Sequence, residues 1–373
     1  MEWKDVRLGD ILNFRRGHDL PHSAMKPGNI PVAGSNGVIG YHDTATPIKP
    51  ILTIGRSGNV GKPYFYEEAW AHNTTLYVDD FKGNDPKFLY YLCQTMPFAN
   101  FGGGSAVPTL NRNHIHPLET KIPVKVEDQR RIASILSSLD RKIELNNKIN
   151  ADLEEMAQAI FKNWFVDFEP FKDGKFVDSE LGMIPEGWNV GSPYEYVKVV
   201  YGAPYKSAKF NANGEDLPLI RIRDLKDCNP QFYTPEILPQ TEYVNMGDIV
   251  AGMDAEFVPH IWKGKMGLLN QRVCKLIPQQ TSISNLFVLY LMKPELEFVQ
   301  SYKTGTTVSH LGKADIDKFV VVLPPLEVVE DCSKLLDSIL QRIKNISAES
   351  RTLSLLRDTL LPRLMSGELE VPE

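Results

Sequence analysis

One pattern occurs twice in this chain. Residues 102–115 read GGGSAVPTLNRNHI and residues 303–316 read KTGTTVSHLGKADI, with Gly, Val, Leu and Ile recurring at the same places. The segment FLYYL at 88–92 is similarly matched by FVLYL at 287–291. A period of about 200 residues is far longer than the 20–50 residues of solenoid repeats. The repeat therefore predicts a duplicated unit, which restricts the fold to two related halves.

Each copy of the pattern is followed by a long helical stretch. The first contains polar and apolar residues spaced alternately by four and three, namely Ile132, Leu136, Leu139, Ile143, Asn146, Asn150, Leu153, Ala157, Ile160 and Trp164. The second has the same spacing at Cys332, Leu336, Ile339, Ile343, Ile346, Ser350, Leu353, Arg357, Leu360 and Leu364. This spacing is typical of a coiled-coil seam, in which polar residues lower stability but fix register. The alternative is two amphipathic helices that pack on separate local cores. The matched register of the seams favours pairing with each other.

The remaining segments follow from composition and periodicity. Residues 167–188, DFEPFKDGKFVDSELGMIPEGW, contain Pro and Gly without a helical period and predict a linker. Short apolar runs such as PILTIG and GDIVAGM predict strands, with one helix near 86–96 and another near 284–293. The expected fold is α+β. Its segments are a globular part at 1–125, a helix at 126–170, a linker at 171–186, a globular part at 187–325, a helix at 326–366 and a tail at 367–373.

Composition excludes several protein classes. The 373 residues include 42% hydrophobic and 24% charged residues, which is typical of a soluble globular protein. The sequence contains neither an 18-residue apolar run nor an N-terminal apolar signal, and its four cysteines are scattered. We therefore expect a cytoplasmic protein without a membrane span, zinc site or disulfide framework. The net charge of −6 arises from the helical stretches and the linker, and an acidic helix suits a protein partner better than a polyanion.

Three short motifs resemble catalytic signatures but do not satisfy them. RSGNVGKP at 56–63 lacks the first Gly and the final Ser or Thr of a phosphate-binding loop, and it predicts a hairpin turn instead. NPQF at 229–232 lacks the second Pro of amino-methylating DNA enzymes, and we find no Gly-rich turn for S-adenosylmethionine. HIH at 114–116 is one pair of histidines, too few to indicate a metal site. The sequence therefore predicts a non-catalytic chain without a metal or catalytic residues.

Basic, amide and hydroxyl side chains gather in the predicted loops of both globular parts. Guanidinium and amide groups suit contacts with base edges, whereas Lys suits phosphates. For any single residue, a solvated surface position is the alternative. The candidate DNA-binding residues in the first half are Arg15, Arg16, Arg56, Lys62, Asn73, Ser105, Asn111 and Arg112. Those in the second half are Lys206, Arg221, Arg223, Lys263, Lys265, Gln271, Arg272, Thr306 and Lys313.

Three stretches carry a resemblance to a known family. They are VPTLNRNHIHPLETKIPVKVEDQRRIASILSSLDRKIELNNKINADLEEMAQAIFKNWFVDFEPF at 107–171, GMIPEGW at 182–188 and RDTLLPRLMSGEL at 357–369. Over essentially its full length the chain resembles the specificity subunits of Type I restriction–modification systems. The resemblance implies two target-recognition domains separated by two antiparallel helices, in a pseudo-twofold molecule. Each domain would read one half of a split site in double-stranded DNA.

The same resemblance implies partners and cofactors. Two modification methyltransferase subunits would bind the helices and methylate adenine with S-adenosylmethionine, and a restriction subunit would add ATP- and Mg-dependent translocation and cleavage. This chain itself would bind no cofactor. Two rival hypotheses are a stand-alone DNA methyltransferase, which needs a cofactor motif, and a coiled-coil scaffold without DNA binding. The sequence does not indicate which bases are read.

Overall fold

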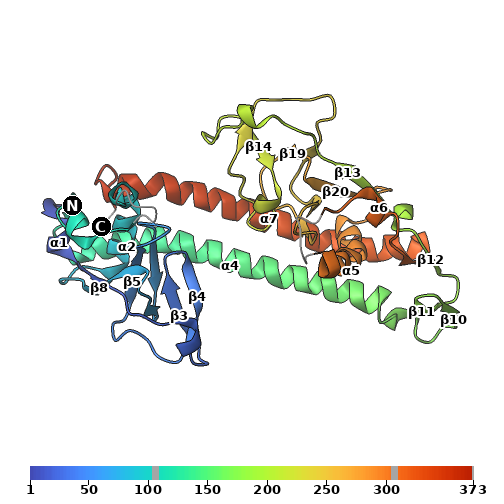
Figure 1. The fold of residues 1–373 in the computed structure, drawn as a ribbon, viewed down its shortest axis with the longest axis horizontal. Helices are drawn as coiled ribbons and strands as arrows, with labels where there is room; N and C mark the ends of the chain where they lie inside the picture. Colours follow the sequence, from blue (N-terminus) through green and yellow to red (C-terminus); the bar gives the residue numbers. More distant parts are fainter. Residues whose placement is uncertain (103–108, 304–309, 372–373) are drawn as a thin grey trace. The chain divides into compact units, whose positions relative to one another are not determined.

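The computed structural model describes residues 1–102, 109–303 and 310–371 and contains both helices and strands (Figure 1). By its internal contacts the chain divides into two units. Unit 1 comprises Met1–Ile143 with Thr352–Glu373, and unit 2 comprises Glu144–Arg351. The division falls inside two long helices, α4 (Val126–Phe165) and α7 (Leu326–Met365). Each unit therefore contains one globular part and one end of each long helix.

Unit 1 is built on short strands that form a four-stranded antiparallel sheet, a three-stranded mixed sheet and one antiparallel pair. Its strands are β1 (Trp3–Arg7), β2 (Asn13–Arg16), β3 (Ile30–Gly34), β4 (Gly37–His42), β5 (Ile51–Gly55), β6 (Pro63–Tyr66), β7 (Trp70–Ala71), β8 (Thr75–Asp80) and β9 (Glu119–Pro123). Its shorter helices are α1 (Leu8–Ile11), α2 (Pro86–Thr95) and α3 (Arg112–Ile115). A four-stranded sheet has the order β2-β8-β5-β6, a second sheet has the order β4-β3-β7, and β1 pairs with β9.

The core of unit 1 joins its sheet to both long helices. Phe14 of β2 and Phe88 of α2 are fully buried there, together with Ile132 and Leu136 of α4 and Leu364 of α7. Helix α2 begins where the Asp85 carboxylate accepts a hydrogen bond from the Phe88 N–H, with proline next to that cap. The predicted turn at 56–63 is confirmed as the connection of the antiparallel β5–β6 hairpin.

Unit 2 contains more strands. They are β10 (Phe176–Ser179), β11 (Gly182–Pro185), β12 (Asn189–Gly191), β13 (Val197–Tyr201), β14 (Leu217–Ile220), β15 (Tyr233–Thr234), β16 (Tyr243–Val244), β17 (Ile249–Gly252), β18 (Pro259–Ile261), β19 (Gly267–Leu269), β20 (Val273–Pro278) and β21 (Val321–Leu323). Its shorter helices are α5 (Asn285–Lys303) and α6 (Lys313–Ile316). The sheets have the orders β13-β20-β17-β18 and β15-β14-β19-β16, and β12 pairs with β21.

Two segments of unit 2 differ from the sequence-based expectation. Helix α5 does not end near residue 293 but continues through Pro294 to Lys303, because Leu296 and Val299 extend its buried face. The predicted linker contains a hairpin, in which β10 pairs with β11. After it, Trp188 is buried against an aromatic cluster at the end of α4. Helix α4 itself ends at Phe165, before the expected boundary at 170.

The sheet β2-β8-β5-β6 of unit 1 and the sheet β13-β20-β17-β18 of unit 2 have equivalent strand orders and equivalent backbone hydrogen bonds. In unit 1 the Gly17 N–H donates to the Thr75 carbonyl, and in unit 2 the Gly202 N–H donates to the Val273 carbonyl. A Cβ on Gly17 or Gly202 would lie 2.1 or 2.2 Å from a backbone oxygen, so the two backbones approach too closely for any other residue. These bonds fix which residues of the two sheets correspond.

The long helices contact each other within each unit. In unit 2 the Asn150 Nδ2 donates to Ser347 Oγ at 3.0 Å, and the Asn146 Nδ2 donates to Glu349 Oε2 at 2.8 Å. In unit 1, Arg357 Nη1 of α7 donates to Asp140 Oδ1 of α4 at 2.9 Å. Residue numbers rise along α4 as they fall along α7, so these contacts are antiparallel. None of the described helices combines the length and apolarity needed to span a membrane.

The predicted seam residues have two kinds of neighbour. Leu153, Leu336 and Ile343 are buried in the core of unit 2, which also includes residues of α5 and of the sheet. Trp164 and Ile346 are only partly buried against that core. Asn150 bonds to Ser347, one turn away from Ser350. The helix faces therefore contribute both to interhelical contact and to the local core of their unit.

Candidate nucleic-acid interface

Five of the predicted DNA-binding residues line one cavity in unit 1. Arg15 and Arg16 lie at the end of β2, Arg56 follows β5, and Asn111 and Arg112 begin α3. The cavity has a volume of about 440 Å³. Its remaining described lining is Leu76, Thr109 and Leu110. We refer to this site as the arginine cleft.

Backbone hydrogen bonds bring these separate segments together. The Arg56 N–H donates to the Thr74 carbonyl at 2.8 Å, and the Arg56 carbonyl accepts from the Leu110 N–H at 2.7 Å. Arg112 Nη1 donates to the Phe14 carbonyl at 3.2 Å, which anchors α3 to β2. The backbone of Arg56 is therefore fixed from both sides, while its side chain lines the cleft.

The charges of the arginine cleft are only partly compensated. Arg15 Nη1 lies 3.7 Å from Asp79 Oδ2, and Arg16 Nη2 lies 3.9 Å from Asp19 Oδ1. Both arginine side chains are mostly exposed, so these ion pairs contribute little stability. Burial, followed by the nearby charge of Arg16, lowers the pKa of Arg56. Arg16 is therefore a like-charged neighbour of Arg56 in the cleft.

The other candidates of unit 1 lie outside this cleft. Lys62 lies above the Tyr64 ring, with its Nζ 5.4 Å from the centroid. Asn73 Nδ2 donates to the Asp19 carboxylate. His116 of the HIH motif accepts the Phe14 N–H at 3.1 Å through Nε2, which makes it a structural residue. Ser105 and Thr306 lie outside the described residues.

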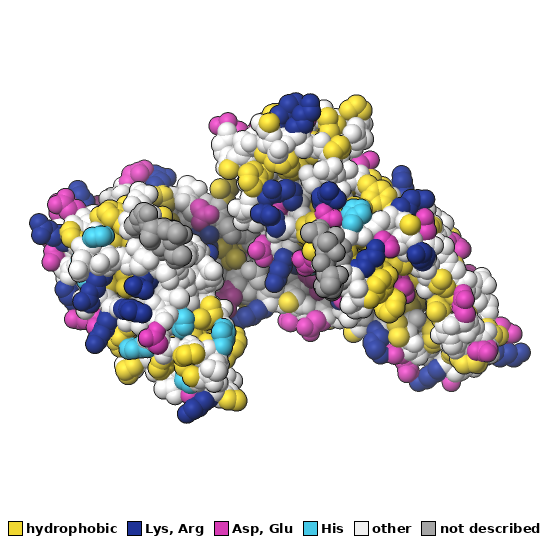
Figure 2. Space-filling model, viewed as in Figure 1, with side chains coloured by type: hydrophobic (Ala, Val, Ile, Leu, Met, Phe, Trp, Pro, Cys, Tyr) yellow, Lys and Arg dark blue, Asp and Glu magenta, His cyan; other side chains and the backbone are white. Residues whose placement is uncertain are grey.

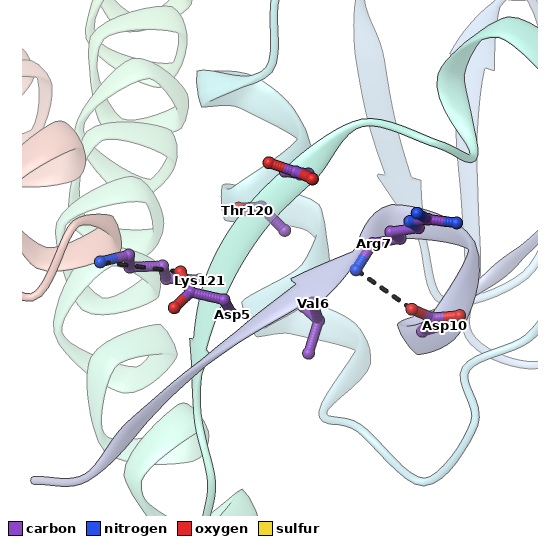
Figure 3. Close-up of a pocket in the computed structure, with 7 residues that line it drawn as sticks. Asp5, Val6, Arg7, Asp10, Thr120 and Lys121 are labelled. Carbon is purple, nitrogen blue, oxygen red and sulfur yellow. Dashed lines mark hydrogen bonds and ion pairs between the residues drawn. The ribbon is translucent and has the colours of Figure 1, made fainter.

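A second cavity in unit 1 is chemically different. It lies on the β1–β9 pair, has a volume of about 560 Å³ and includes both cations and carboxylates (Figure 3). Lys121 Nζ lies 3.7 Å from Asp5 Oδ1, and the Arg7 N–H donates to Asp10 Oδ2 at 3.2 Å. Charges of both signs make this cavity less suited than the arginine cleft to a polyanion. Figure 2 likewise shows Lys and Arg mixed with Asp and Glu on the visible face.

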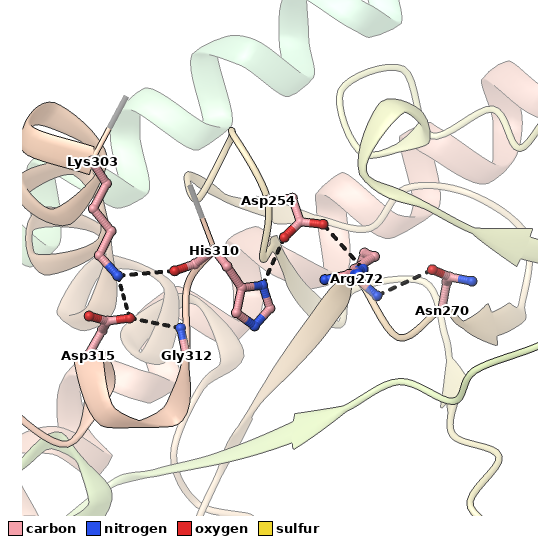
Figure 4. A network of polar contacts seen from close by, with 7 residues as sticks. All are labelled: Asp254, Asn270, Arg272, Lys303, His310, Gly312 and Asp315. Carbon is pink, nitrogen blue, oxygen red and sulfur yellow. Dashed lines mark hydrogen bonds and ion pairs between the residues drawn. The ribbon is translucent and has the colours of Figure 1, made fainter. Parts of the chain in front are cut away.

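Unit 2 has a polar network in the corresponding part of its sheet (Figure 4). Asp254 Oδ2 lies 3.3 Å from Arg272 Nε, and Asp254 Oδ1 lies 2.8 Å from His310 Nδ1. Lys303 Nζ donates to the His310 carbonyl at 3.0 Å and pairs with Asp315 at 2.6 Å. Of these residues, only Arg272 was a candidate from sequence. His310 had a detectable signal, because it lies within the repeated pattern.

The remaining candidates of unit 2 are dispersed. Arg221 stacks on Phe232, with its Cζ 4.2 Å from the ring centroid, and Lys263 pairs with Glu154 of α4 at 2.8 Å. Lys313 lies 3.7 Å from Asp317, on the short helix α6. The backbone N–H groups of Lys206 and Gln271 donate hydrogen bonds, and the backbone carbonyl of Lys265 accepts one. Arg223 is exposed. Lys263 thus ties the globular part of unit 2 to α4.

Described His, Cys, Asp and Glu side chains form no group of three or more that is placed to hold a metal ion. Burial also raises the pKa of the Cys332 thiol to about 12, which disfavours its reactive thiolate form.

The family model and the similar proteins indicate the same protein family. The sequence pattern of the Type I restriction modification DNA specificity domain matches residues 1–155 and 185–353. The Type I restriction enzyme MjaIX specificity subunit of Methanocaldococcus jannaschii is 29% identical over 77% of this chain and 70% of its own length. The HindI specificity subunit of Haemophilus influenzae is 25% identical over 98% of this chain and 94% of its own length.

A solved structure has the same fold. The Type I restriction–modification system S subunit from M. genitalium superposes with a TM-score of 0.59 and covers 98% of this chain and 96% of that one, at 14% identity. At that identity the likeness concerns the fold alone. Because the family pattern covers well over half of the sequence, the chain belongs to the Type I restriction modification DNA specificity family, whose members are non-catalytic recognition subunits.

Proposed function

We propose that the globular part of each unit reads one half of a bipartite site in double-stranded DNA. The observation that carries this proposal is a repeated backbone frame that displays different side chains. The Leu110 N–H donates to the Arg56 carbonyl, and the Leu311 N–H donates to the Met253 carbonyl, both at 2.7 Å. Arg56 and Met253 therefore occupy equivalent places. A common frame with different side chains suits two domains that bind the same kind of polymer but read different sequences.

We further propose that α4 and α7 form an antiparallel coiled-coil spacer in a pseudo-twofold molecule. The interhelical bonds Asn150–Ser347 and Asp140–Arg357 support this arrangement, since polar contacts in a helical seam fix register. The spacer would hold the two recognition parts at a set separation. Its acidic surface would also bind two modification methyltransferase subunits.

The chemistry of methylation and cleavage is assigned to those partners. S-adenosylmethionine would bind to the methyltransferase subunits, and ATP with Mg would serve a restriction subunit. This chain would bind no cofactor of its own and would act in the cytoplasm. Its purified form should therefore transfer no methyl groups without a methyltransferase partner.

The test is genome-wide methylation mapping in a host with and without the gene. The gene should add methylation at one bipartite sequence. Exchange of residues 1–125 for those of a relative should change one half of that sequence and leave the other half and the gap unchanged. A change in both halves would contradict independent reading. Methyl transfer by the purified chain alone would contradict the assignment of catalysis to partners.

A further inference from the structure

The arginine cleft of unit 1 differs in charge from the equivalent place in unit 2. The Arg56 N–H donates to the Thr74 carbonyl at 2.8 Å, and the Met253 N–H donates to the Arg272 carbonyl at 2.9 Å. The two bonds occupy the same position in sheets of the same strand order. Arg56 of unit 1 is thus replaced by Met253, which is nearly fully buried.

Arg15 and Arg16 of unit 1 are also replaced by uncharged residues at the equivalent places of unit 2. Arg16 precedes Gly17, and its equivalent Tyr201 precedes Gly202, so the strand end that carries two arginines in unit 1 reads Val200-Tyr201 in unit 2. The place of Arg112 is taken by Lys313. The positions equivalent to the four arginines of unit 1 therefore hold a single cationic side chain, Lys313, in unit 2. Arg272, at the place of Thr74, adds one guanidinium group, which pairs with Asp254.

The second unit also adds a carboxylate. Asp254 follows Met253 and contacts both Arg272 and His310, whereas Ser57 follows Arg56. A carboxylate that pairs with two basic groups neutralises charge locally. In the arginine cleft the nearest carboxylates are those of Asp79 and Asp19, at 3.7 and 3.9 Å from exposed guanidinium groups. The cleft thus lacks close compensation within the described residues.

Taking the proposed DNA function as its basis, we propose that the arginine cleft binds a backbone phosphate of DNA. Several guanidinium groups that converge from β2, β5 and α3 on one cavity suit a tetrahedral anion with oxygens on all sides. A phosphate would also relieve the mutual repulsion of Arg16 and Arg56. Unit 1 therefore supplies a phosphate contact, and hence salt-dependent affinity, that the equivalent place of unit 2 does not supply.

The experiment uses the full chain in its complex with the modification subunits. Its probes are a duplex that contains the mapped methylation site and a scrambled duplex of equal length. Dissociation constants are measured at several salt concentrations between about 50 and 200 mM, where each phosphate contact contributes about 0.9 to the slope of log K against log salt. The test variant is Arg16→Gln with Arg56→Gln. The matched control is Lys172→Gln with Lys175→Gln, which removes two exposed cations from the segment that follows α4.

The test variant should show a slope smaller in magnitude by about 1, with affinity for both duplexes reduced by the same factor. The control should keep the slope of the unaltered complex. Arg16→Lys with Arg56→Lys should restore the slope, because Lys provides a positive charge without the bidentate geometry needed at a base edge. Thermal unfolding of each variant checks that the fold is intact.

Two results would overturn the phosphate site. One is an unchanged slope in the Gln variant. The other is an altered methylated sequence in both the Gln and the Lys variants, which would show that the cleft reads a base. Binding by the unaltered complex separates a failure of the phosphate site from a failure of the proposed DNA-recognition function. Its failure to prefer the mapped duplex would contradict the DNA-recognition function itself, whereas a normal preference with an unchanged slope would contradict the cleft alone.

Discussion

Asp140 is the residue at which three helices of unit 1 meet. Its carboxylate accepts hydrogen bonds from the Tyr91 hydroxyl of α2 at 2.6 Å and from Arg357 of α7 at 2.9 Å. The Tyr91 side chain is fully buried. Burial, followed by the bond to Asp140, raises the pKa of Tyr91 well above its ordinary value. This contact therefore links the globular part of unit 1 to both long helices.

Asp140→Ala should lower the free energy of unfolding by about 1–3 kcal/mol, because it leaves the buried Tyr91 hydroxyl without an acceptor. Asp358→Ala is the matched control. Asp358 also pairs with Arg357, at 2.8 Å, but its side chain is 62% exposed, so its loss should cost about 0–1 kcal/mol. Denaturant titration of both variants measures the difference. Equal losses would show that the Tyr91 bond contributes nothing to stability.

The buried hydroxyl of Tyr66 should make the stability of the fold depend on pH. Its hydroxyl is buried without a hydrogen-bond partner among the described residues, and burial, followed by Tyr64 and Tyr90, raises its pKa to about 12. An unfolded tyrosine ionises near pH 10. The unfolded chain therefore loses its proton first, so this contribution to stability is complete below pH 10 and is lost as the pH rises toward 12.

Tyr66→Phe should leave stability at pH 7 unchanged or slightly increased. Near pH 11.5 the variant should be more stable than the unaltered chain by about 2 kcal/mol, since 1 pKa unit corresponds to about 1.36 kcal/mol. Tyr41→Phe removes a hydroxyl from a 59% exposed side chain and serves as the control. Unfolding titrations at both pH values test this. A pH dependence of Tyr66→Phe identical to that of the control would contradict it.

At the residue scale, the arginines were candidates from the sequence, but their convergence on one cavity was not predicted. Arg15, Arg16, Arg56 and Arg112 were all candidates, yet nothing in their spacing indicates a common cavity. They meet because β2, β5 and the segment after residue 109 are joined by sheet and loop hydrogen bonds. Lys263, another sequence candidate for a DNA contact, pairs with Glu154 on α4, and the sequence pattern does not indicate that ion pair.

At the element scale, the apolar periodicity predicted the long helices. It did not predict the continuation of α5 past residue 293 or the hairpin of β10 and β11. The starts of α4 at Val126 and of α7 at Leu326 agree with the sequence-based boundaries. The helix expected near 284–293 continues through Pro294, because tertiary burial of the following apolar residues outweighs the lost backbone bond. The hairpin at 176–185 had no clear alternation, and several of its side chains are exposed.

The seam of α7 gives a prediction at this scale. Ile343 is fully buried within unit 2. Ile343→Asp should destabilise unit 2 by about 3–5 kcal/mol, because it places an unpaired charge in an apolar core. Gln341→Asp puts the same side chain on an exposed position of the helix and should have little effect. Stability is followed by circular dichroism, and assembly by co-purification with methyltransferase subunits.

We expect Ile343→Asp to lose assembly and Gln341→Asp to retain it. Normal assembly and stability of Ile343→Asp would show that this face of α7 carries neither the seam nor the core contact. The result also addresses the two interpretations of the helical pattern, because a variant that unfolds unit 2 alone points to local packing. Loss of assembly with unit 2 still folded points to the paired helices.

At the scale of the whole molecule, the proposed division of labour assigns sequence to the globular parts and spacing to the helices. Under this proposal the globular parts share one backbone frame, so each would change its half-site through side chains without altering the other. The gap between the half-sites would then depend on helix length alone. A chain built in this way should allow its gap to be changed independently of its bases.

An insertion of seven residues tests that separation. The Asn150–Ser347 bond sets the local register of the helices, so one insertion follows Asn147 in α4 and its partner follows Glu349 in α7. Seven residues add about two turns and about 10 Å, which nearly preserves the helical phase and the seam. This length corresponds to about three base-pair steps at roughly 3.4 Å each.

Methylation mapping should then reveal the original half-sites separated by a gap about three base pairs longer. A four-residue insertion in both helices provides the contrast, because it rotates the following segment by about 40° relative to a full turn and displaces the seam. That variant should lose assembly or activity. If the seven-residue variant assembles and methylates with the original gap, α4 and α7 do not set the spacing. If its half-sites change instead, base reading depends on the helices, and the independent recognition inferred from the repeated frame is wrong.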